Sequence, residues 1–180
     1  EKAKGYAKKL NLLHLRIQNI KFFDSACGSG NFLIISYKEI RKLEMLIFKE
    51  GGLLICPSIK LTQFYGIELD DFAHEVAILS LWLAEHQMNV LFKKEFGTVP
   101  PALPLQDGGN IVHGNATRLD WEKVCPKNIN DEIYILGNPP YLGFLQQNRI
   151  QKEDMDYVFA DRDTIRKLDY ISCWFYLGAK

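Results

Sequence analysis

The chain has 180 residues, 47% of them hydrophobic and 24% charged, a balance that predicts one folded domain with a sizeable core. No apolar run reaches the roughly 18 residues that span a bilayer, and the charged residues 1–9 do not form a signal peptide, so we expect no membrane partner. The 22 basic and 22 acidic residues cancel, whereas a complete DNA-binding protein normally carries a basic footprint. Only residues 1–60, with 11 basic and 5 acidic residues, have a basic excess. For a protein that binds DNA, so small a basic region indicates that the chain is part of a larger protein.

The cysteines and histidines do not form a metal-binding pattern. The cysteines are widely spaced and include no Cys-x-x-Cys pair, so we interpret them as reduced thiols of a cytoplasmic protein. The histidines show no ligand spacing and are predicted to be surface or packing residues. These eight residues are Cys27, Cys56, Cys125, Cys173, His14, His74, His86 and His113. No metal site is therefore expected.

The first predicted unit is an apolar strand at 20–24, a glycine turn, and a helix that ends near residue 49. Gly28 and Gly30 would allow a ligand to approach the backbone, and the helix start would offer N–H groups to a carboxylate or phosphate. Leu33 stands where a dinucleotide fingerprint would have its third glycine. The pattern therefore favours a nucleoside ligand without a pyrophosphate over NAD.

A second strand is predicted at 63–69, followed by a helix at about 71–89. Glu68 ends this strand, where a carboxylate can accept hydrogen bonds from ribose hydroxyls. A helix N-cap is an equally good interpretation of a single acidic residue here, and we assign that role to Asp70 or Asp71. Glu68 follows Gly30 by 38 residues, and an inserted loop or hairpin at 50–61 would account for this long spacing.

A third strand is predicted at 110–114, after a linker-like segment at 96–109 that is rich in proline and glycine. Asn115 follows this strand directly and is placed to meet the edge of an adenine that lies across the sheet. A plain turn after Gly114 remains an alternative interpretation of this segment.

The fourth predicted strand, at 133–137, runs into Asn138-Pro139-Pro140-Tyr141. The Asn138 side-chain oxygen and the Pro139 carbonyl are two neutral acceptors that can hold both hydrogens of one amino group. Tyr141 offers a flat face on which a heteroaromatic ring can stack. A strand-terminating turn is the alternative for such a tetrapeptide alone. Beyond it, residues 142–163 are predicted to be a mobile loop with a solvated acidic run that includes Asp154.

Four motifs in this order resemble those of S-adenosylmethionine-dependent amino-group DNA methyltransferases of the adenine-N6 kind. The motifs are Asp-x-Ala-Cys-Gly-Ser-Gly-Asn-Phe, Tyr-Gly-Ile-Glu, Gly-Asn-Ala and Asn-Pro-Pro-Tyr. Residues 63–89 resemble more narrowly the large single-chain restriction-modification enzymes of type IIG or IIL. Ser25 replaces a usual proline of the first motif, and Asn115 replaces a more common aspartate but keeps a carbonyl acceptor for the cofactor adenine.

The resemblance implies a class I, Rossmann-like α/β fold with a doubly wound, mostly parallel sheet of about four strands in the order 3-2-1-4. It implies S-adenosylmethionine as cofactor and a flipped adenine in double-stranded DNA as target. Residues 1–180 would form part of the cofactor-binding and catalytic domain, with a target-recognition domain outside them and an endonuclease domain possible in the same chain. The implied cofactor-binding residues are Asp24, Ala26, Cys27, Gly28, Gly30, Asn31, Phe32, Glu68, Leu69, Asn115 and Ala116, and the implied catalytic residues are Asn138, Pro139, Pro140 and Tyr141.

Other targets and roles stay open at this point. The same tetrapeptide would suit a glutamine amide in a protein, an exocyclic amine in RNA, or N4 of cytosine. Tyr141 at the end of the motif favours adenine over cytosine, and residues 63–89 favour DNA over protein or RNA. A Rossmann-like domain that acts only as an interaction module is the non-enzymatic alternative.

Overall fold

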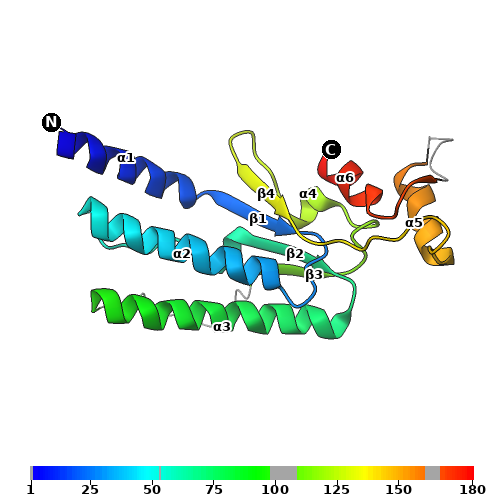
Figure 1. The fold of residues 1–180 in the computed structure, drawn as a ribbon, viewed down its shortest axis with the longest axis horizontal. Coiled ribbons are helices and arrows are strands. Elements are labelled where there is room, and N and C mark those ends of the chain that lie inside the picture. Colours follow the sequence, from blue (N-terminus) through cyan, green and yellow to red (C-terminus); the bar gives the residue numbers. More distant parts are fainter. Residues whose placement is uncertain (1, 53, 98–108, 161–166) are drawn as a thin grey trace.

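A computed structural model describes residues 2–52, 54–97, 109–160 and 167–180 of the chain. Its centre is a four-stranded sheet in the order β3-β2-β1-β4, in which every neighbouring pair is parallel (Figure 1). The strands are β1 (Ile20–Asp24), β2 (Phe64–Glu68), β3 (Asn110–His113) and β4 (Glu132–Leu136). The predicted fold class and strand order are confirmed. The strand order reverses direction between β1 and β4, which is where ligands bind in such sheets.

Helices cover both faces of the sheet. Figure 1 shows α1, α2 and α3 side by side along one face, with α4 and α6 on the other face and α5 beyond the carboxyl ends of the strands. The helices are α1 (Lys2–Ile17), α2 (Asn31–Gly51), the short 3-10 helix η1 (Leu61–Gln63), α3 (Asp71–Phe96), α4 (Trp121–Val124), α5 (Arg149–Val158) and α6 (Ser172–Gly178). The α3 helix is longer than predicted, since it continues to Phe96.

Residues of β1 and β2 are buried on both faces of the sheet, on alternating sides as the two-residue period of a β-strand requires. Phe22 and Phe64 stack at 5.0 Å on the face covered by α2 and α3. Phe23 and Ile67 point to the opposite face and pack with Trp121 at the start of α4. Burial on both faces explains why the strands are continuous apolar runs in the sequence.

The segment after α2 is held by one buried carboxylate. Glu44 is fully buried in α2, pairs with Arg41, and accepts hydrogen bonds from the backbone N–H groups of Ser58 and Ile59 at 2.6 and 3.2 Å. The described part of the predicted inserted loop is therefore an irregular segment fastened to α2. It returns the chain to η1 and β2.

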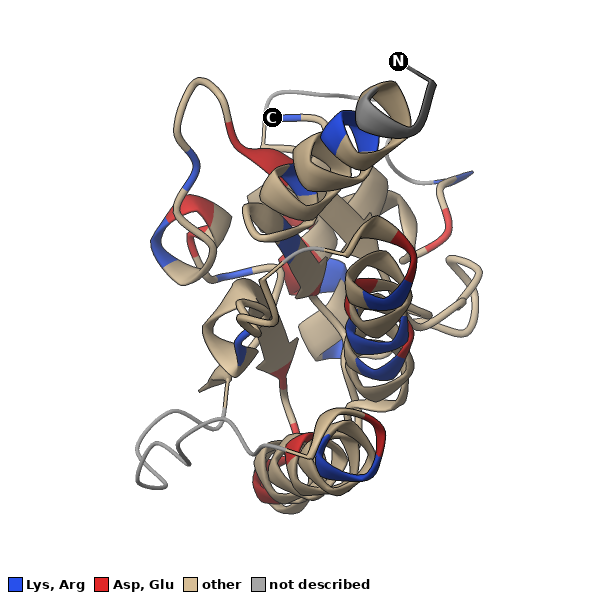
Figure 2. Cartoon of the chain, turned by 90° about the vertical axis from the view of Figure 1, so that its left-hand side faces the viewer, with Lys and Arg blue, Asp and Glu red and all other residues tan. Residues whose placement is uncertain are grey.

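Five of the eleven basic residues of the N-terminal third form ion pairs within the described part of the protein. Figure 2 views the molecule from the end opposite the carboxyl ends of the strands, and its ribbon is coloured blue at Lys and Arg positions of α1 and α2. Arg16 pairs with Glu132, Lys21 with Asp131, and Lys49 with Glu95. The basic excess of residues 1–60 is thus not gathered at the ligand end of the sheet. None of the described helices is long and apolar enough to cross a membrane.

Candidate functional site

A cavity of about 460 Å³ lies where the four strands end. The loops after β1, β2, β3 and β4 all contribute to its wall, as expected at the carboxyl edge of a parallel sheet. The predicted site residues that line it are Ala26, Gly28, Glu68, Leu69, Asn115, Ala116, Asn138 and Pro140. Predicted site residues that are up to 114 positions apart in the chain, Ala26 and Pro140, therefore share one cavity.

The glycine turn after β1 contributes to the cavity through one of its two predicted glycines. Gly28 has φ of 54° and lines the cavity, and a side chain there would meet no atom within 4 Å. Gly30 has φ of 84° and lies against α3, where an added Cβ would come within 3.3 Å of the Ala77 backbone. Gly28 thus leaves space for a ligand, whereas Gly30 allows α2 and α3 to pack closely.

The helix that follows this turn begins without a side-chain cap. Gly30 is the N-cap residue of α2 and provides no side-chain hydrogen bond. Asn31 and Phe32, in the first turn, do not line the cavity, and Phe32 is 48% exposed. The uncapped turn still carries N–H groups and a positive partial charge that favour an anion such as a carboxylate.

Asp24 is a buried carboxylate with one oxygen unsatisfied. It is fully buried at the end of β1, and its Oδ1 accepts a hydrogen bond of 3.0 Å from the Ala26 N–H. Its Oδ2 has no partner among the described residues. Burial, and secondarily the nearby Glu68 charge, raise the pKa of Asp24 to about 6. Asp24 does not line the cavity, whereas Ser25 and Ala26 directly after it do. An unpaired buried acceptor beside the cavity suits a cationic group of a ligand.

Gly137, directly before Asn138, allows the ends of β1 and β4 to come close together. Its φ is 144°, and an added Cβ would collide with Oδ1 of Asp24. Leu136 is also the register partner of Asp24 in the β1–β4 pair. The sheet therefore places the buried carboxylate beside the Asn-Pro-Pro-Tyr segment.

Cys27 is part of the turn but does not line the cavity. It is 6% exposed, and its backbone N–H donates to the Ile67 carbonyl at 3.0 Å. Burial raises the pKa of its thiol to about 12. Its side chain packs with the core, and a side chain on Gly66 would come within 3.0 Å of its sulfur.

Glu68 joins the turn after β1 to the start of α3. Its Oε2 accepts from the Gly28 N–H at 2.6 Å, and its Oε1 accepts from the Asp70 N–H at 2.8 Å. Each carboxylate oxygen keeps a second lone pair for a ligand hydroxyl. Asp70 is the N-cap residue of α3 and accepts from the Ala73 N–H at 2.8 Å, so its predicted capping role is confirmed.

Asn115 lines the cavity, but both ends of its amide are occupied. Its Oδ1 accepts from the N–H and the hydroxyl of Thr117 at 2.9 and 2.8 Å. Its Nδ2 donates to Asp154 at 3.0 Å. The side-chain carbonyl that we expected to meet a cofactor adenine is therefore turned toward the protein.

The Asn-Pro-Pro-Tyr segment follows β4 as an extended loop. Asn138 and Pro140 line the cavity, whereas Pro139 and Tyr141 do not. Neither the Asn138 amide nor the Tyr141 hydroxyl is hydrogen-bonded to another described residue. Tyr141 is 67% exposed, so its ring is available at the outer side of the cavity.

The cavity wall also includes residues of a region that we predicted to be a mobile loop. That prediction is wrong for residues 149–158, which form α5, and Asp154 is 2% exposed instead of solvated. The predicted loop residues 161–163 lie outside the described part of the chain. The cavity residues missed by the sequence reasoning are Asn148, Ile150, Gln151, Asp154, Tyr170 and Trp174. The Asn148-x-x-Gln151 capping box is a local signal that could have revealed this helix.

Asp154 holds this wall in place. It accepts hydrogen bonds from Arg118 Nε at 2.6 Å, from the Tyr170 hydroxyl at 2.7 Å and from Asn115. Burial opposes its ionisation, but these three donors outweigh burial and lower the pKa of Asp154. Trp174 adds a second link, since its indole N–H donates to the Ser25 carbonyl at 3.2 Å.

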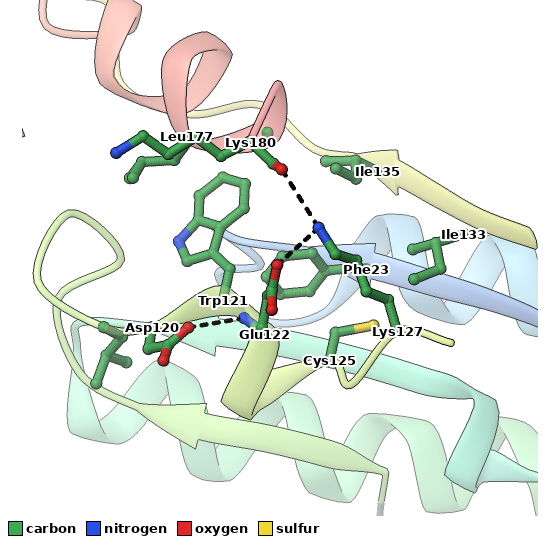
Figure 3. A pocket seen from close by; sticks show the side chains of 12 residues that line it. Phe23, Asp120, Trp121, Glu122, Cys125, Lys127, Ile133, Ile135, Leu177 and Lys180 are labelled. Carbon is green, nitrogen blue, oxygen red and sulfur yellow. Dashed lines mark hydrogen bonds and ion pairs between the residues drawn. The ribbon is translucent and has the colours of Figure 1, made fainter. Parts of the chain in front are cut away.

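A second cavity, of about 400 Å³, lies under α6 on the other side of the sheet (Figure 3). Figure 3 shows Phe23, Trp121 and Ile133 around it, with Lys127 paired to Glu122 at 2.7 Å near its edge. None of the predicted site residues lines it. Its wall is mainly apolar, so we assign no chemistry to it.

One cluster of possible metal ligands occurs among the described residues, at the start of α3. Asp71, His74 and Glu75 place ligand atoms within 4.8 Å of one another. His74 also contacts the Ile111 carbonyl at 3.2 Å. The cluster does not line the cavity, and its carboxylates are exposed.

Comparison with known proteins identifies restriction-modification methyltransferases as relatives. DNA methyltransferase A of Bacillus subtilis (strain 168) is 54% identical over 97% of this chain, which corresponds to 20% of that protein. The type II restriction enzyme and methyltransferase RM.Eco57I of Escherichia coli is 27% identical over 79% of this chain and 16% of its own length. The solved structure of the type IIL restriction-modification enzyme MmeI in complex with DNA superposes with a TM-score of 0.86 at 35% identity.

The chain spans only part of these relatives. The MmeI match covers 99% of this chain and 25% of that chain. The family model described as MmeI, DNA-methyltransferase domain, matches residues 1–180. The chain therefore belongs to the MmeI DNA-methyltransferase domain family.

Proposed function

We propose that this chain is the cofactor-binding and catalytic part of an S-adenosylmethionine-dependent methyltransferase that modifies N6 of adenine in double-stranded DNA. The observation that carries this proposal is the single cavity that joins Gly28 and Glu68 to Asn138 and Pro140. A nucleoside cofactor and a target amine would then meet at one place. Membership of the MmeI methyltransferase domain family supports methyl transfer as the reaction.

The residues around the cavity fit S-adenosylmethionine, which supplies a methyl group on a sulfonium when bound. Asp24 Oδ2, buried and unpaired among the described residues, suits the ammonium of the methionine part. The uncapped first turn of α2 suits its carboxylate. Glu68 keeps lone pairs for the ribose hydroxyls. Leu69 and Ala116 are apolar walls for the adenine.

The target base would reach the cavity only after leaving the DNA stack, because N6 of a stacked adenine is inaccessible. Flipping costs a few kcal/mol, and stacking on an aromatic ring returns roughly 1–3 kcal/mol per base. Tyr141, with 67% of its surface exposed, is free to provide that ring. The oxygens of Asn138 and Pro139 would accept the two amino hydrogens and direct the nitrogen lone pair into the cavity. Both acceptors are neutral, so they position the amine without first removing a proton.

We further propose that residues 1–180 are one part of the methyltransferase domain of a longer protein. The curated relatives are several times longer than this chain, and one of them is a combined restriction enzyme and methyltransferase. Five of the eleven basic residues of 1–60 are ion-paired within the described part of the chain. DNA sequence recognition, and any nuclease activity, would then be carried by other parts of the full-length protein.

The test is methylation of genomic DNA by the full-length protein, read by base-resolved sequencing that separates N6-methyladenine from N4-methylcytosine. We expect N6-methyladenine in one sequence context and none with Asn138→Ala. Parallel reactions on protein and RNA substrates test the two other amine targets. N4-methylcytosine alone, or methyl transfer to protein or RNA alone, would refute the proposed target.

A further inference from the structure

The amino end of α5 carries two amides whose orientation is set by the helix itself. Asn148 Oδ1 accepts from the Gln151 N–H, and Gln151 Oε1 accepts from the Asn148 N–H, both at 2.9 Å. Each backbone N–H requires an oxygen, so the orientation of both amides is unambiguous. Both oxygens are therefore used by the capping box. Each oxygen keeps one lone pair, and both NH₂ groups can donate to a ligand, since neither is hydrogen-bonded to another described residue.

Most hydrogen-bonding groups of the other polar side chains near the loop after β3 already have partners within the protein. Asn115 uses both ends of its amide, and the Tyr170 hydroxyl donates to Asp154. Asp154 and Glu68 are acceptors. Among the loop residues that line the cavity, an adenine would find only the second N–H of Asn115, whose other N–H donates to Asp154, as a side-chain donor for its ring nitrogens, which are hydrogen-bond acceptors.

The hydrogen bond from Asn115 to Asp154 brings α5 to this same loop. Gln151 is three residues before Asp154, and residues at this spacing share one face of a helix. Both residues line the cavity, and Gln151 is half-buried. Its free NH₂ group is thus on the side of α5 that meets the loop after β3, and Ile150 beside it adds an apolar contact to the same cavity.

We propose that Gln151 is a further cofactor-binding residue, which donates its amide N–H to a ring nitrogen of the cofactor adenine. This inference rests on the proposed function, because it assumes that the cavity takes an adenine nucleoside. The flipped target adenine carries the same ring acceptors, and the experiment below separates the two sources. In this assignment the adenine is recognised by Gln151 on α5 and not by Asn115, whose amide oxygen accepts from Thr117.

The decisive substitution is Gln151→Glu in the full-length protein. A glutamate keeps the oxygen that the Asn148 N–H requires, so the capping box remains, but it removes the NH₂ donor. The matched control is Gln146→Glu, which adds the same charge just before α5 at an exposed side chain that does not line the cavity. By calorimetry without DNA, we expect Gln151→Glu to bind S-adenosylhomocysteine about five- to tenfold more weakly, and Gln146→Glu within about twofold of the unmodified protein.

A second arm uses the unmodified protein, so it does not depend on the folding of a variant. S-adenosylhomocysteine analogues in which N1, N3 or N7 of the adenine is replaced by C–H are compared with the parent compound. One analogue should bind about fivefold more weakly, and its loss should disappear in Gln151→Glu. Equal binding of all three analogues, or equal losses of affinity in the Gln151 and Gln146 variants, would overturn the inference.

The same measurements separate this inference from the proposed function. If the unmodified protein does not bind S-adenosylhomocysteine, the proposed function fails, and the inference fails with it. If binding without DNA is unchanged in Gln151→Glu while the KM for DNA rises, the amide contacts the target base, and the cofactor assignment is wrong.

Discussion

Replacing Glu68 with alanine tests whether this side chain binds the cofactor, and a control variant separates that effect from a loss of stability. The side chain lies between Gly28 and Asp70 and accepts a backbone hydrogen bond from each, at 2.6 and 2.8 Å. In the proposed complex its remaining lone pairs accept from the ribose hydroxyls. The substitution therefore removes a ligand contact and two contacts within the protein at the same time.

The size of the expected effect follows from these contacts. A hydrogen bond to a charged group contributes about 1.5–3 kcal/mol, which corresponds to a roughly 10- to 150-fold loss of affinity. The loss of the two internal acceptors also destabilises the turn. Asp70→Ala is the matched control, because it removes the N-cap contact to Ala73 at 2.8 Å and costs about 1 kcal/mol without touching the cavity lining.

The assay is calorimetric titration of both full-length variants with S-adenosylmethionine, alongside thermal unfolding. We expect Glu68→Ala to lose at least tenfold in affinity, and Asp70→Ala to lose less than threefold at a similar decrease in stability. Unchanged affinity in folded Glu68→Ala would remove this residue from the site. Equal losses of affinity in the two variants would show that destabilisation of the turn, and not the loss of a ligand contact, weakens cofactor binding.

Four further changes test other parts of the site. Asn138→Ala should abolish methyl transfer while cofactor affinity stays within about twofold, and near-normal turnover would contradict its role at the amine. Tyr141→Phe should be mild and Tyr141→Ala severe in turnover assays, because the hydroxyl contacts no described residue and only the ring can stack; equal damage would contradict this. Cofactor affinity should rise between pH 5 and 7 as Asp24, with its pKa raised to about 6, becomes ionised, and a similar rise in Asp24→Asn would exclude this residue as the cause. Asp154→Ala should weaken the α5 wall by about 2 kcal/mol or more, seen as roughly 30-fold faster hydrogen exchange in α5, and unchanged exchange would contradict its anchoring role.

The strands could be predicted because local sequence patterns mark each of them. Their order in the sheet could be predicted because the order of elements along the chain allows few arrangements. Residues such as Phe22 and Phe64 belong to short apolar runs bounded by turn residues, and parallel strands connected by helices leave few possible arrangements. The motif residues Gly28, Glu68 and Asn138 were predictable for the same reason, since each ends a strand or follows its end within four residues. Strand ends of a parallel sheet meet at one edge, so residues that end strands must come together.

The α5 wall was not predictable in this way, because its role depends on contacts between distant segments. Asp154 belongs to a run of charged residues that resembles a solvated surface, yet it is buried by donors that come from residues 115, 118 and 170. The same contacts turn the Asn115 amide away from the position that its place after β3 suggested. Burial and hydrogen-bond direction are properties of the assembled neighbourhood, since a side chain's partners are chosen by packing and not by its position in the sequence.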